Sequence, residues 1–431
     1  MKTAFIILCI LCLAAAIVWV LGYSFVRAFI RRQDDLPSPE TGGECSSLLA
    51  PTGEALWEHN IPYFEPFRAL PFEKLVICSA DGLKLRADLL RGKGDTGVTV
   101  IFCHGYKSEP AFDFAAMYDF YHALGYNLMY LHMRAHGESE GKYIGFGALD
   151  RYDVVLWAKK AAELFPGSSI FLHGMSMGAA SILQCADLEL PDNVRGIIAD
   201  CGYSCIDEVF RNLVGRMYHL PETPFVNIFE LINLITAGYG FRDGDSVRSM
   251  QRSKLPLLYI CGDSDLYVPA DMAMRIFDAC AAEKELLLVP GAGHAASYML
   301  EKKKYQNAVR GFIAKHRRDI EYGRQNTREK ERHRSVELDA SAGHRLFGAD
   351  RLGDREQLVC KLPVLGLRRA ARRRDRHDHM LGHRHDLLRA VFRNAFRPYR
   401  LPQKAHHLGL NTVGRLHHRL RPDPLSARQH I

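Results

Sequence analysis

The 431-residue chain lacks regularly spaced cysteines. Its 11 cysteines are scattered, and the single C-x-x-C among them, Cys9 and Cys12, lies within the uncharged N-terminal stretch. An odd number without regular spacing argues against a disulfide framework and favours a reducing compartment. Cys103 and Cys261 fall within apolar runs, where a free cysteine acts as a small hydrophobic residue.

Charged residues are absent from Thr3 to Val26. As a helix rising ~1.5 Å per residue, this stretch would extend ~36 Å, which is enough to cross a bilayer core with some tilt. We therefore expect residues 1–28 to form an uncleaved, single-pass membrane anchor. A cleaved signal peptide is the alternative, but the stretch is long and no convincing small-x-small cleavage site precedes the arginines that follow it. Positive residues flank both ends, so the side of the membrane stays open.

The main body lacks the excess positive charge that the whole chain carries. Residues 1–316 hold 30 Lys and Arg against 36 Asp and Glu, a net charge of −6. Residues 317–431 hold 27 against 13, a net charge of +14. Binding to nucleic acid is therefore not expected of the main domain, because such binding depends on a basic surface.

The C-terminal segment, residues 319–431, has almost no lysine. Residues 317–431 contain 3 Lys, 24 Arg and 11 of the 20 histidines. One interpretation is a disordered basic tail that binds nucleic acid or anionic lipid, and another is a metal site at His377, His379, His383 and His385. A third, which accounts best for the near loss of lysine, is translation in a shifted reading frame of a GC-rich gene.

Between these ends, residues 72–318 alternate short apolar runs with helix-like stretches, after a linker and lead-in at residues 29–71. Asp81-Gly82 forms the turn of an opening hairpin. The predicted strands are Leu75–Cys78, Leu83–Leu89, Val98–Cys103, Asn127–Leu131, Ser169–His173, Val194–Ala199, Leu255–Cys261 and Glu285–Val289. The predicted helices are Ala111–Leu124, Asp150–Leu164, Ser176–Leu188, Ala270–Ala281 and Ala296–Lys315. This alternation predicts an α/β fold, with a mostly parallel sheet covered by helices on both faces.

Residues 202–254 lack a clear core strand and contain apolar residues at helical spacing. We expect an amphipathic helical insertion between two strands. It forms either a cap over a site at the edge of the sheet or ordinary packing helices.

A Gly-x-Ser-x-Gly motif lies between a predicted strand and a predicted helix. It reads Gly174-Met175-Ser176-Met177-Gly178. A strand, a sharp turn and a helix are the context that a nucleophile elbow requires, and glycines on either side of the serine permit so tight a turn. Ser176 is therefore the predicted nucleophile.

Two further residues follow later strands in the order that the motif predicts. Asp265 comes just after one strand and His294 follows the last on a glycine-rich loop. A carboxylate can hold the histidine in the right tautomer, and the histidine can take the serine proton. Asp263 is the alternative acid, although an aspartate there more commonly binds the amides of a turn.

The backbone after another strand can stabilise an oxyanion. His104-Gly105-Tyr106 follows the strand Val98–Cys103, which brings the Tyr106 N–H toward the predicted serine. The N–H of Met177, at the start of the next helix, is the expected second donor.

These motifs closely resemble the α/β-hydrolase superfamily over about residues 72–318. The stretch Arg134-Ala135-His136-Gly137, with Asp150, Asp153 and Trp157, also resembles membrane-anchored bacterial hydrolases described as serine aminopeptidase-like, although His132 stands where the superfamily often has an aspartate. The resemblance implies an eight-stranded sheet with a helical cap. It further implies a serine hydrolase that uses no metal or organic cofactor.

The expected function is that of a membrane-anchored serine hydrolase that cleaves an acyl ester, thioester or amide. Its expected partners are a small-molecule or lipid-like acyl substrate and the membrane that the N-terminal helix enters. A non-catalytic binding protein of the same fold, or an adaptor acting through the basic tail, is the alternative.

Overall fold

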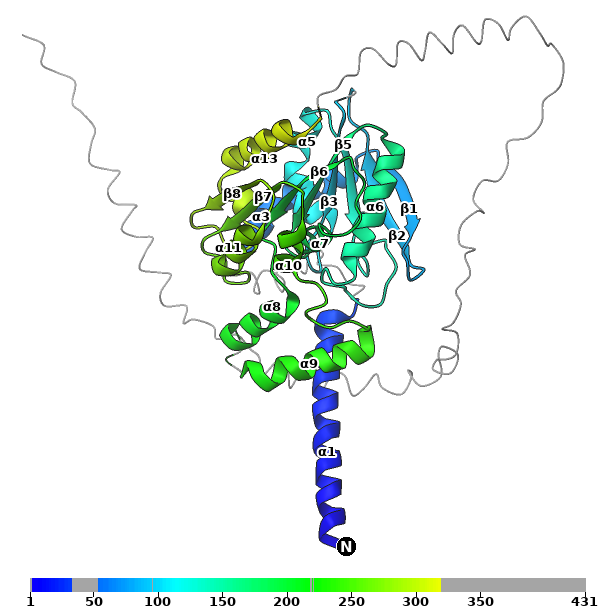
Figure 1. Ribbon diagram of the computed structural model, residues 1–431, viewed down its shortest axis with the longest axis vertical. Coiled ribbons are helices and arrows are strands. Elements are labelled where there is room, and N and C mark those ends of the chain that lie inside the picture. Colours follow the sequence, from blue (N-terminus) through cyan, green and yellow to red (C-terminus); the bar gives the residue numbers. More distant parts are fainter. Residues whose placement is uncertain (1, 33–52, 95, 218, 220, 319–431) are drawn as a thin grey trace, which may run out of the picture. The chain divides into compact units, whose positions relative to one another are not determined.

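The computed structural model describes residues 2–32, 53–94, 96–217, 219 and 221–318 (Figure 1). Residues 33–52 of the predicted linker and the basic tail at 319–431 lie outside the described residues. The interpretations given above for those two segments therefore stay predictions.

Eight strands form one sheet in the order β1-β2-β4-β3-β5-β6-β7-β8. The strands are β1 (Glu73–Cys78), β2 (Lys84–Leu90), β3 (Val98–Cys103), β4 (Asn127–His132), β5 (Ser169–Met175), β6 (Val194–Asp200), β7 (Leu257–Gly262) and β8 (Lys284–Val289). β2 pairs antiparallel with both β1 and β4, and the other pairings are parallel. Every residue of β3, β5 and β7 is buried, which explains why these strands are continuous apolar runs.

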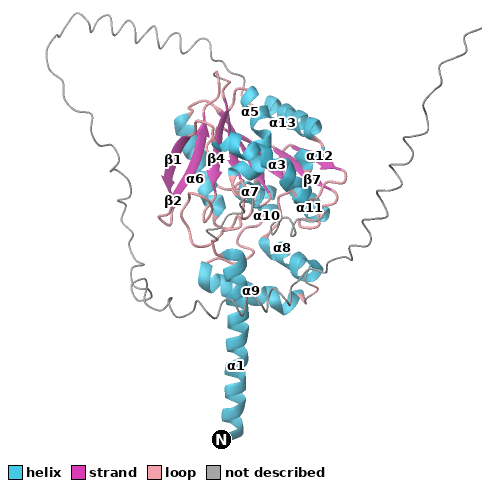
Figure 2. Ribbon diagram, turned by 180° about the vertical axis from the view of Figure 1, so that it is seen from behind, coloured by secondary structure: helices cyan, strands magenta, loops and turns pink. Residues whose placement is uncertain are grey.

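Helices cover both faces of the sheet, as Figure 2 shows. Those packed on one face are α6 (Asp150–Leu164), α7 (Met177–Gln184), α10 (Ser246–Arg252) and α11 (Ala270–Ala279). Those on the other are α3 (Gly53–Arg68), α4 (Pro110–Phe114), η2 (Ala115–Met117), α5 (Tyr118–Ala123), α12 (Ser297–Leu300) and α13 (Lys302–His316). Phe114 and Glu301 leave helical φ and ψ, so the helices predicted at 111–124 and 296–315 are each divided.

Helix α3 lies within residues 29–71, for which the sequence predicts a linker and lead-in. Leu56, Phe64 and Phe67 lie on one side of α3 and are at most 5% exposed. Pro62 and Pro66 inside the helix, each costing ~3 kcal/mol in an isolated helix, hid this pattern in the sequence. Burial of the aromatic rings against the sheet offsets that cost, so α3 is part of the domain.

The N-terminal apolar segment also extends further than predicted. α1 (Lys2–Phe25) runs directly into η1 (Val26–Ile30), beyond the expected boundary at residue 28. The side chains of Val26 and Ile30 are 1% and 0% exposed within the main core. The end of the apolar segment is thus packed into the α/β domain, whereas the rest of α1 is exposed except for Gly22 and two half-buried residues that follow it.

Helices α8 (Ile206–Asn212), η3 (Leu213–Met217) and α9 (Glu222–Ala237) lie with α10 between β6 and β7. No strand occurs among the described residues of 202–254. In both ribbon views α9 crosses α1 close to the domain (Figures 1 and 2). The Phe25 and Phe229 rings stack there, with their centroids 3.8 Å apart.

If α3 belongs to the domain, Phe64→Ala should lower the free energy of unfolding by ~3–5 kcal/mol, because it opens a cavity in the core. The matched control is Ile61→Ala on the same helix, where the side chain is 38% exposed and the loss should stay below ~1 kcal/mol. Urea denaturation of the detergent-solubilised chain measures both. Equal, small losses would show that α3 contributes little to the folded domain.

Candidate active site

Ser176 occupies a strained turn between β5 and α7. Its φ of 51° and ψ of −112° lie outside the regions that non-glycine residues normally adopt. Its N–H donates to the Asp200 carbonyl at 2.8 Å, and its carbonyl accepts the N–H of Ala180 at 2.9 Å. These two hydrogen bonds hold the turn, and they join the end of β6 to the start of α7.

The glycines of the motif are required by close backbone approach. A Cβ atom on Gly178 would overlap the carbonyl of Cys103 at the end of β3, and one on Gly174 would overlap the backbone of Gly178 and Ala179. Helix α7 can therefore begin directly against β3 and β5 only if both positions lack a side chain.

The structure brings the three predicted side chains together in one hydrogen-bonded chain. His294 Nε2 lies 2.8 Å from Ser176 Oγ, and His294 Nδ1 lies 2.8 Å from Asp265 Oδ2. Ser176 is 8% exposed, Asp265 is 5% exposed and His294 is 6% exposed. A carboxylate that accepts the Nδ1 proton leaves Nε2 free to accept the serine hydroxyl.

Electrostatics around His294 favour its cation. Burial lowers the pKa of His294, but the charge of Asp265 and its hydrogen bond outweigh burial, so that the pKa lies above 6.5. Asp265 is itself fixed, because its other oxygen accepts the N–H groups of Tyr267 and Val268 at 2.8 and 2.9 Å. The carboxylate is thus oriented toward the imidazole before any substrate binds.

Asp263 lies apart from the imidazole. Its Oδ1 accepts the Gly291 N–H at 2.7 Å and the Ser264 hydroxyl at 2.9 Å. It therefore ties the loop that leads to His294 to the end of β7. Of the two acids that the sequence left open, the geometry brings Asp265 to the histidine.

The loop after β3 passes beside Ser176. A Cβ atom on Gly105 would lie 3.5 Å from Ser176 Cβ, which puts the next peptide close to the serine. Met177, fully buried, begins α7 on the other side. Tyr106 thus follows the loop residue that lies close to Ser176, and Met177 follows Ser176 itself at the N-terminus of α7.

Polar contacts hold this loop from several elements. The Gly105 N–H donates to Asp113 Oδ2 at 2.6 Å, and the Lys107 N–H donates to His136 Nε2 at 3.0 Å. Burial lowers the pKa of His136 to about 4, so its Nε2 stays an acceptor at neutral pH. The Tyr106 hydroxyl donates to the Phe29 carbonyl at 2.8 Å. The loop is therefore anchored to α4, to the stretch after β4 and to η1.

Two buried carboxyl groups near the serine were missed in the sequence. Burial raises the pKa of Asp113 to about 6 and that of Asp200 to about 7. Asp200 ends β6, so the rule that selected Asp265, an acid at the end of a buried strand, could have found it. Asp113 lies within α4, and no local pattern marks it.

The Arg-x-His-Gly stretch forms a supporting ion pair. The Arg134 guanidinium binds both oxygens of Asp153, at 2.7 and 2.9 Å, with all partners buried. His132, which replaces the usual aspartate, lies 3.4 Å from Asp88. The Arg134–Asp153 ion pair holds the backbone next to His136. His136 in turn accepts the Lys107 N–H from the loop beside Ser176.

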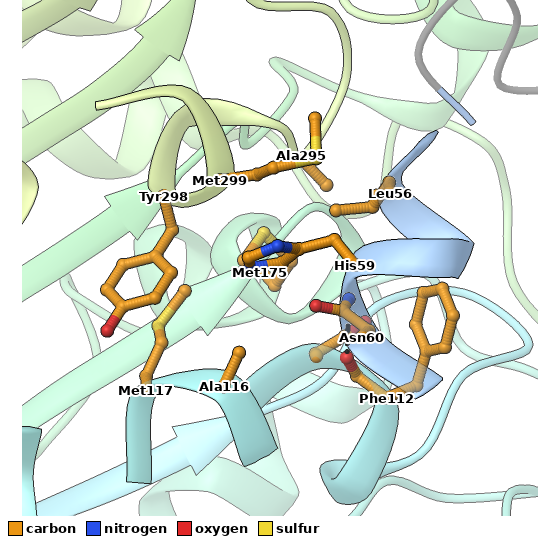
Figure 3. Close-up of a pocket in the computed structure, with 11 residues that line it drawn as sticks. Leu56, His59, Asn60, Phe112, Ala116, Met117, Met175, Ala295, Tyr298 and Met299 are labelled. Carbon is orange, nitrogen blue, oxygen red and sulfur yellow. Dashed lines mark hydrogen bonds between the residues drawn. The ribbon is translucent and has the colours of Figure 1, made fainter. Parts of the chain in front are cut away.

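Figure 3 shows a small cavity whose lining includes Met175 and Ala295, the chain neighbours of Ser176 and His294. It is lined by residues of α3, of α4 with η2, of the end of β5 and of the stretch after His294: Leu56, His59, Asn60, Phe112, Asp113, Ala116, Met117, Met175, Ala295, Tyr298 and Met299. Met175 directly precedes Ser176, and Ala295 directly follows His294. Burial and the nearby Lys302 lower the pKa of His59, so this histidine is uncharged at neutral pH.

Two groups of side chains in the described part of the chain have metal-ligand geometry. They are Asp88, His132 and Glu138, and Glu283, Glu285 and His316. In the first, the Lys74 ammonium binds Asp88 at 2.8 Å and Glu138 at 2.7 Å. In the second, Lys315 binds both glutamates. A lysine already supplies the positive charge in each group, so neither is interpreted as a metal centre.

Comparison with known proteins confirms the predicted resemblance. The family model described as "Serine aminopeptidase, S33" matches residues 94–219, from the end of the β2–β3 connection into the cap. The match includes the Tyr106 loop and the serine motif and ends before Asp265 and His294. The chain has the α/β-hydrolase fold.

Two relatives and one solved structure each match 57–58% of this chain. The protein YqkD of Bacillus subtilis is 28% identical over 255 residues, which are 58% of this chain and 82% of YqkD. The membrane protein YNL320W of Saccharomyces cerevisiae is 23% identical over 248 residues, 57% of this chain and 81% of its own. Among solved structures, the Pyrococcus furiosus esterase Pf2001 is 22% identical with a TM-score of 0.48, and covers 58% of this chain and 93% of its own.

If the serine turn depends on close approach to β3, Gly178→Ala should destabilise the chain by several kcal/mol, because rigid backbone cannot move away from the new methyl group. Gly311→Ala in α13 is the control. A methyl group there meets open space, so stability should stay equal or rise by ~0.4–1 kcal/mol. Thermal unfolding compares the two, and a Gly178→Ala variant as stable as the control would contradict the steric account.

Proposed function

We propose that the protein is a membrane-anchored serine hydrolase that cleaves an acyl ester, thioester or amide. The observation that carries this proposal is the hydrogen-bonded chain Ser176–His294–Asp265 at the carboxyl end of the sheet. A base that lies 2.8 Å from both the nucleophile and the orienting acid satisfies the geometric requirement for acyl transfer. The family match supports the same class of reaction.

The reaction proceeds in two halves. His294 Nε2 takes the hydroxyl proton of Ser176 as Oγ bonds to the substrate carbonyl carbon. The imidazolium, stabilised by Asp265, then gives that proton to the leaving alcohol, thiol or amine as its bond to carbon breaks. Water then attacks the acyl carbon while His294 takes a proton from it. His294 gives that proton to Ser176 Oγ as the bond from Oγ to the acyl carbon breaks and the free acid leaves.

The charge that develops on the carbonyl oxygen is met by backbone amides. We assign this role to the N–H groups of Tyr106 and Met177, which flank Ser176. Each such donor is worth ~3 kcal/mol of barrier in other enzymes. The contacts of Gly105 with Asp113 and of Lys107 with His136 keep the loop amide in place.

The cavity favours an uncharged, partly apolar acyl group. Methionine and aliphatic side chains make up much of its wall, and its polar members His59 and Asn60 carry no charge at neutral pH. Its acidic member, Asp113, is engaged by the Gly105 N–H and the Ser108 hydroxyl. Since a free carboxylate is what would recognise an α-ammonium group, the lining supports esters and thioesters over aminoacyl amides.

Membrane anchoring rests on α1. Residues 2–30 form one apolar helix long enough to span a bilayer, and none of its most apolar window is buried. The yeast relative carries the name of a membrane protein, which supports the same interpretation. We therefore propose that the anchor predicted at residues 1–28 continues to Ile30, where its end packs into the domain.

Labelling with a fluorophosphonate probe tests the proposed nucleophile, because the probe reacts only with an activated serine. Ser176→Ala should abolish labelling of the folded chain. Ser264→Ala, an exposed serine beside the same edge of the sheet, should label as the wild type does. Absence of Ser176-dependent labelling would leave the non-catalytic binding protein as the better interpretation.

The pH profile tests the assignment of Asp265. The base must be neutral, so kcat/KM for a small ester should fall as pH drops through the raised pKa of His294. Asp265→Asn removes the charge that raises this pKa, so the acid limb should move to lower pH, with kcat reduced ~10⁴-fold. Asp263→Asn should leave the limb in place and most of the activity intact. The reverse pattern would assign the acid to Asp263.

A further inference from the structure

Helix α9 exposes an apolar stripe. Leu231, Leu234 and Ile235 are 56%, 50% and 59% exposed, and their spacing places them on one side of the helix. Three large aliphatic side chains on one exposed helical face require an explanation in a water-facing cap.

The same helix packs on α1 at a defined height. Ile228 and Ile232 lie against Gly22, whose missing side chain lets the two helices approach, and Phe229 stacks on Phe25. Figures 1 and 2 both show α9 running across α1 at this point. The crossing at Gly22 therefore fixes where α9 lies along the apolar helix.

That height corresponds to the surface of a bilayer. Residues 2–21 of α1 are exposed, and at ~1.5 Å per residue they extend ~30 Å, the thickness of a hydrocarbon core. If α1 spans the membrane, Gly22 lies at the boundary between acyl chains and headgroups. A helix that crosses α1 there lies in the plane of the interface.

We propose that the exposed face of α9 is a second membrane contact, embedded in the interface of the bilayer that α1 spans, and that the cap takes its acyl substrate from that surface. This inference rests on the proposed membrane anchor. The stripe on α9 continues the apolar surface of α1, which argues for lipid. A second copy of the chain is disfavoured, because three side chains are far fewer than the ~20–30 residues per partner of a standard protein interface.

Contacts link this surface to the loops of the active site. The Lys107 ammonium donates to the Ala28 carbonyl at 2.9 Å, next to the hydrogen bond from Tyr106 to Phe29. At the other end of the cap, Asn212 donates to the carbonyl of Leu266, directly after Asp265, at 2.9 Å. The loops that carry the proposed oxyanion donor and the proposed acid thus contact η1, which continues α1, and α8, which precedes α9 in the chain.

Site-specific photo-crosslinking in the full chain tests the contact. A benzophenone amino acid is placed at Leu234, at Leu8 of α1, or at Val76 of β1, which is 48% exposed on the sheet edge. The protein is reconstituted in phosphatidylcholine–phosphatidylglycerol vesicles that contain a fluorescent phospholipid. We expect lipid adducts at Leu234 and Leu8 and none at Val76.

The outcomes separate the inference from its premise. Adducts at Leu8 without adducts at Leu234 would overturn the α9 contact and leave the anchor standing. No adducts at either position would overturn both. A protein dimer crosslinked through Leu234, in place of lipid adducts, would assign the face to a second copy and reject the inference.

Kinetics test the uptake of substrate. Replacing Leu231 and Leu234 by serine should lower the rate on an ester embedded in vesicles several-fold and leave hydrolysis of a soluble ester unchanged. Val76→Ser is the matched control for loss of an exposed apolar side chain. An unchanged rate on the vesicle ester would reject uptake through the cap, whereas failure to hydrolyse either ester in the wild type would reject the proposed function itself.

Discussion

The close approach of α7 to the carboxyl ends of β3 and β5 is the constraint on which the site depends. Gly174 and Gly178 permit it, since any side chain at either position would meet backbone. The approach forces Ser176 into its strained φ and ψ and sets its hydroxyl beside the loop after β3. One steric condition therefore positions both the proposed nucleophile and the backbone to which the proposed oxyanion donors belong.

Three carboxyl groups affect the charge state of His294. Asp265, Asp200 and Asp113, in decreasing order of their Coulombic effect, favour the imidazolium against the burial that disfavours it. Asp200 and Asp113 have pKa values of about 7 and 6 because they are themselves buried. Each therefore gains or loses charge near neutral pH, and the potential at the imidazole changes with them. Asp265, by contrast, is fixed by two backbone amides and the histidine.

The sequence was sufficient for the parts of the fold that follow from local pattern. Continuous apolar runs predicted the strands to within about two residues, since every residue of the central strands is buried. Ser176, Asp265 and His294 were singled out because each comes after a predicted strand, and the structure brings their side chains together. Helix α3 was missed because Pro62 and Pro66 disguise a helix that tertiary packing stabilises. Asp113 was missed because only the folded chain brings it to Gly105. Which of Asp263 and Asp265 faces the histidine is likewise a matter of loop geometry that spacing does not determine.

Part of the cavity wall and the serine motif come from different parts of the chain. Leu56, His59 and Asn60 come from α3, which precedes the stretch shared with the serine aminopeptidase family. If the cavity holds the acyl group as proposed, substitutions on α3 would alter which group fits and leave Ser176, Asp265 and His294 unchanged. Proteins that share the serine motif with this chain would then diverge in substrate through a helix outside the family match. The substrate of one relative can be inferred for another only where the helix that corresponds to α3 is also similar.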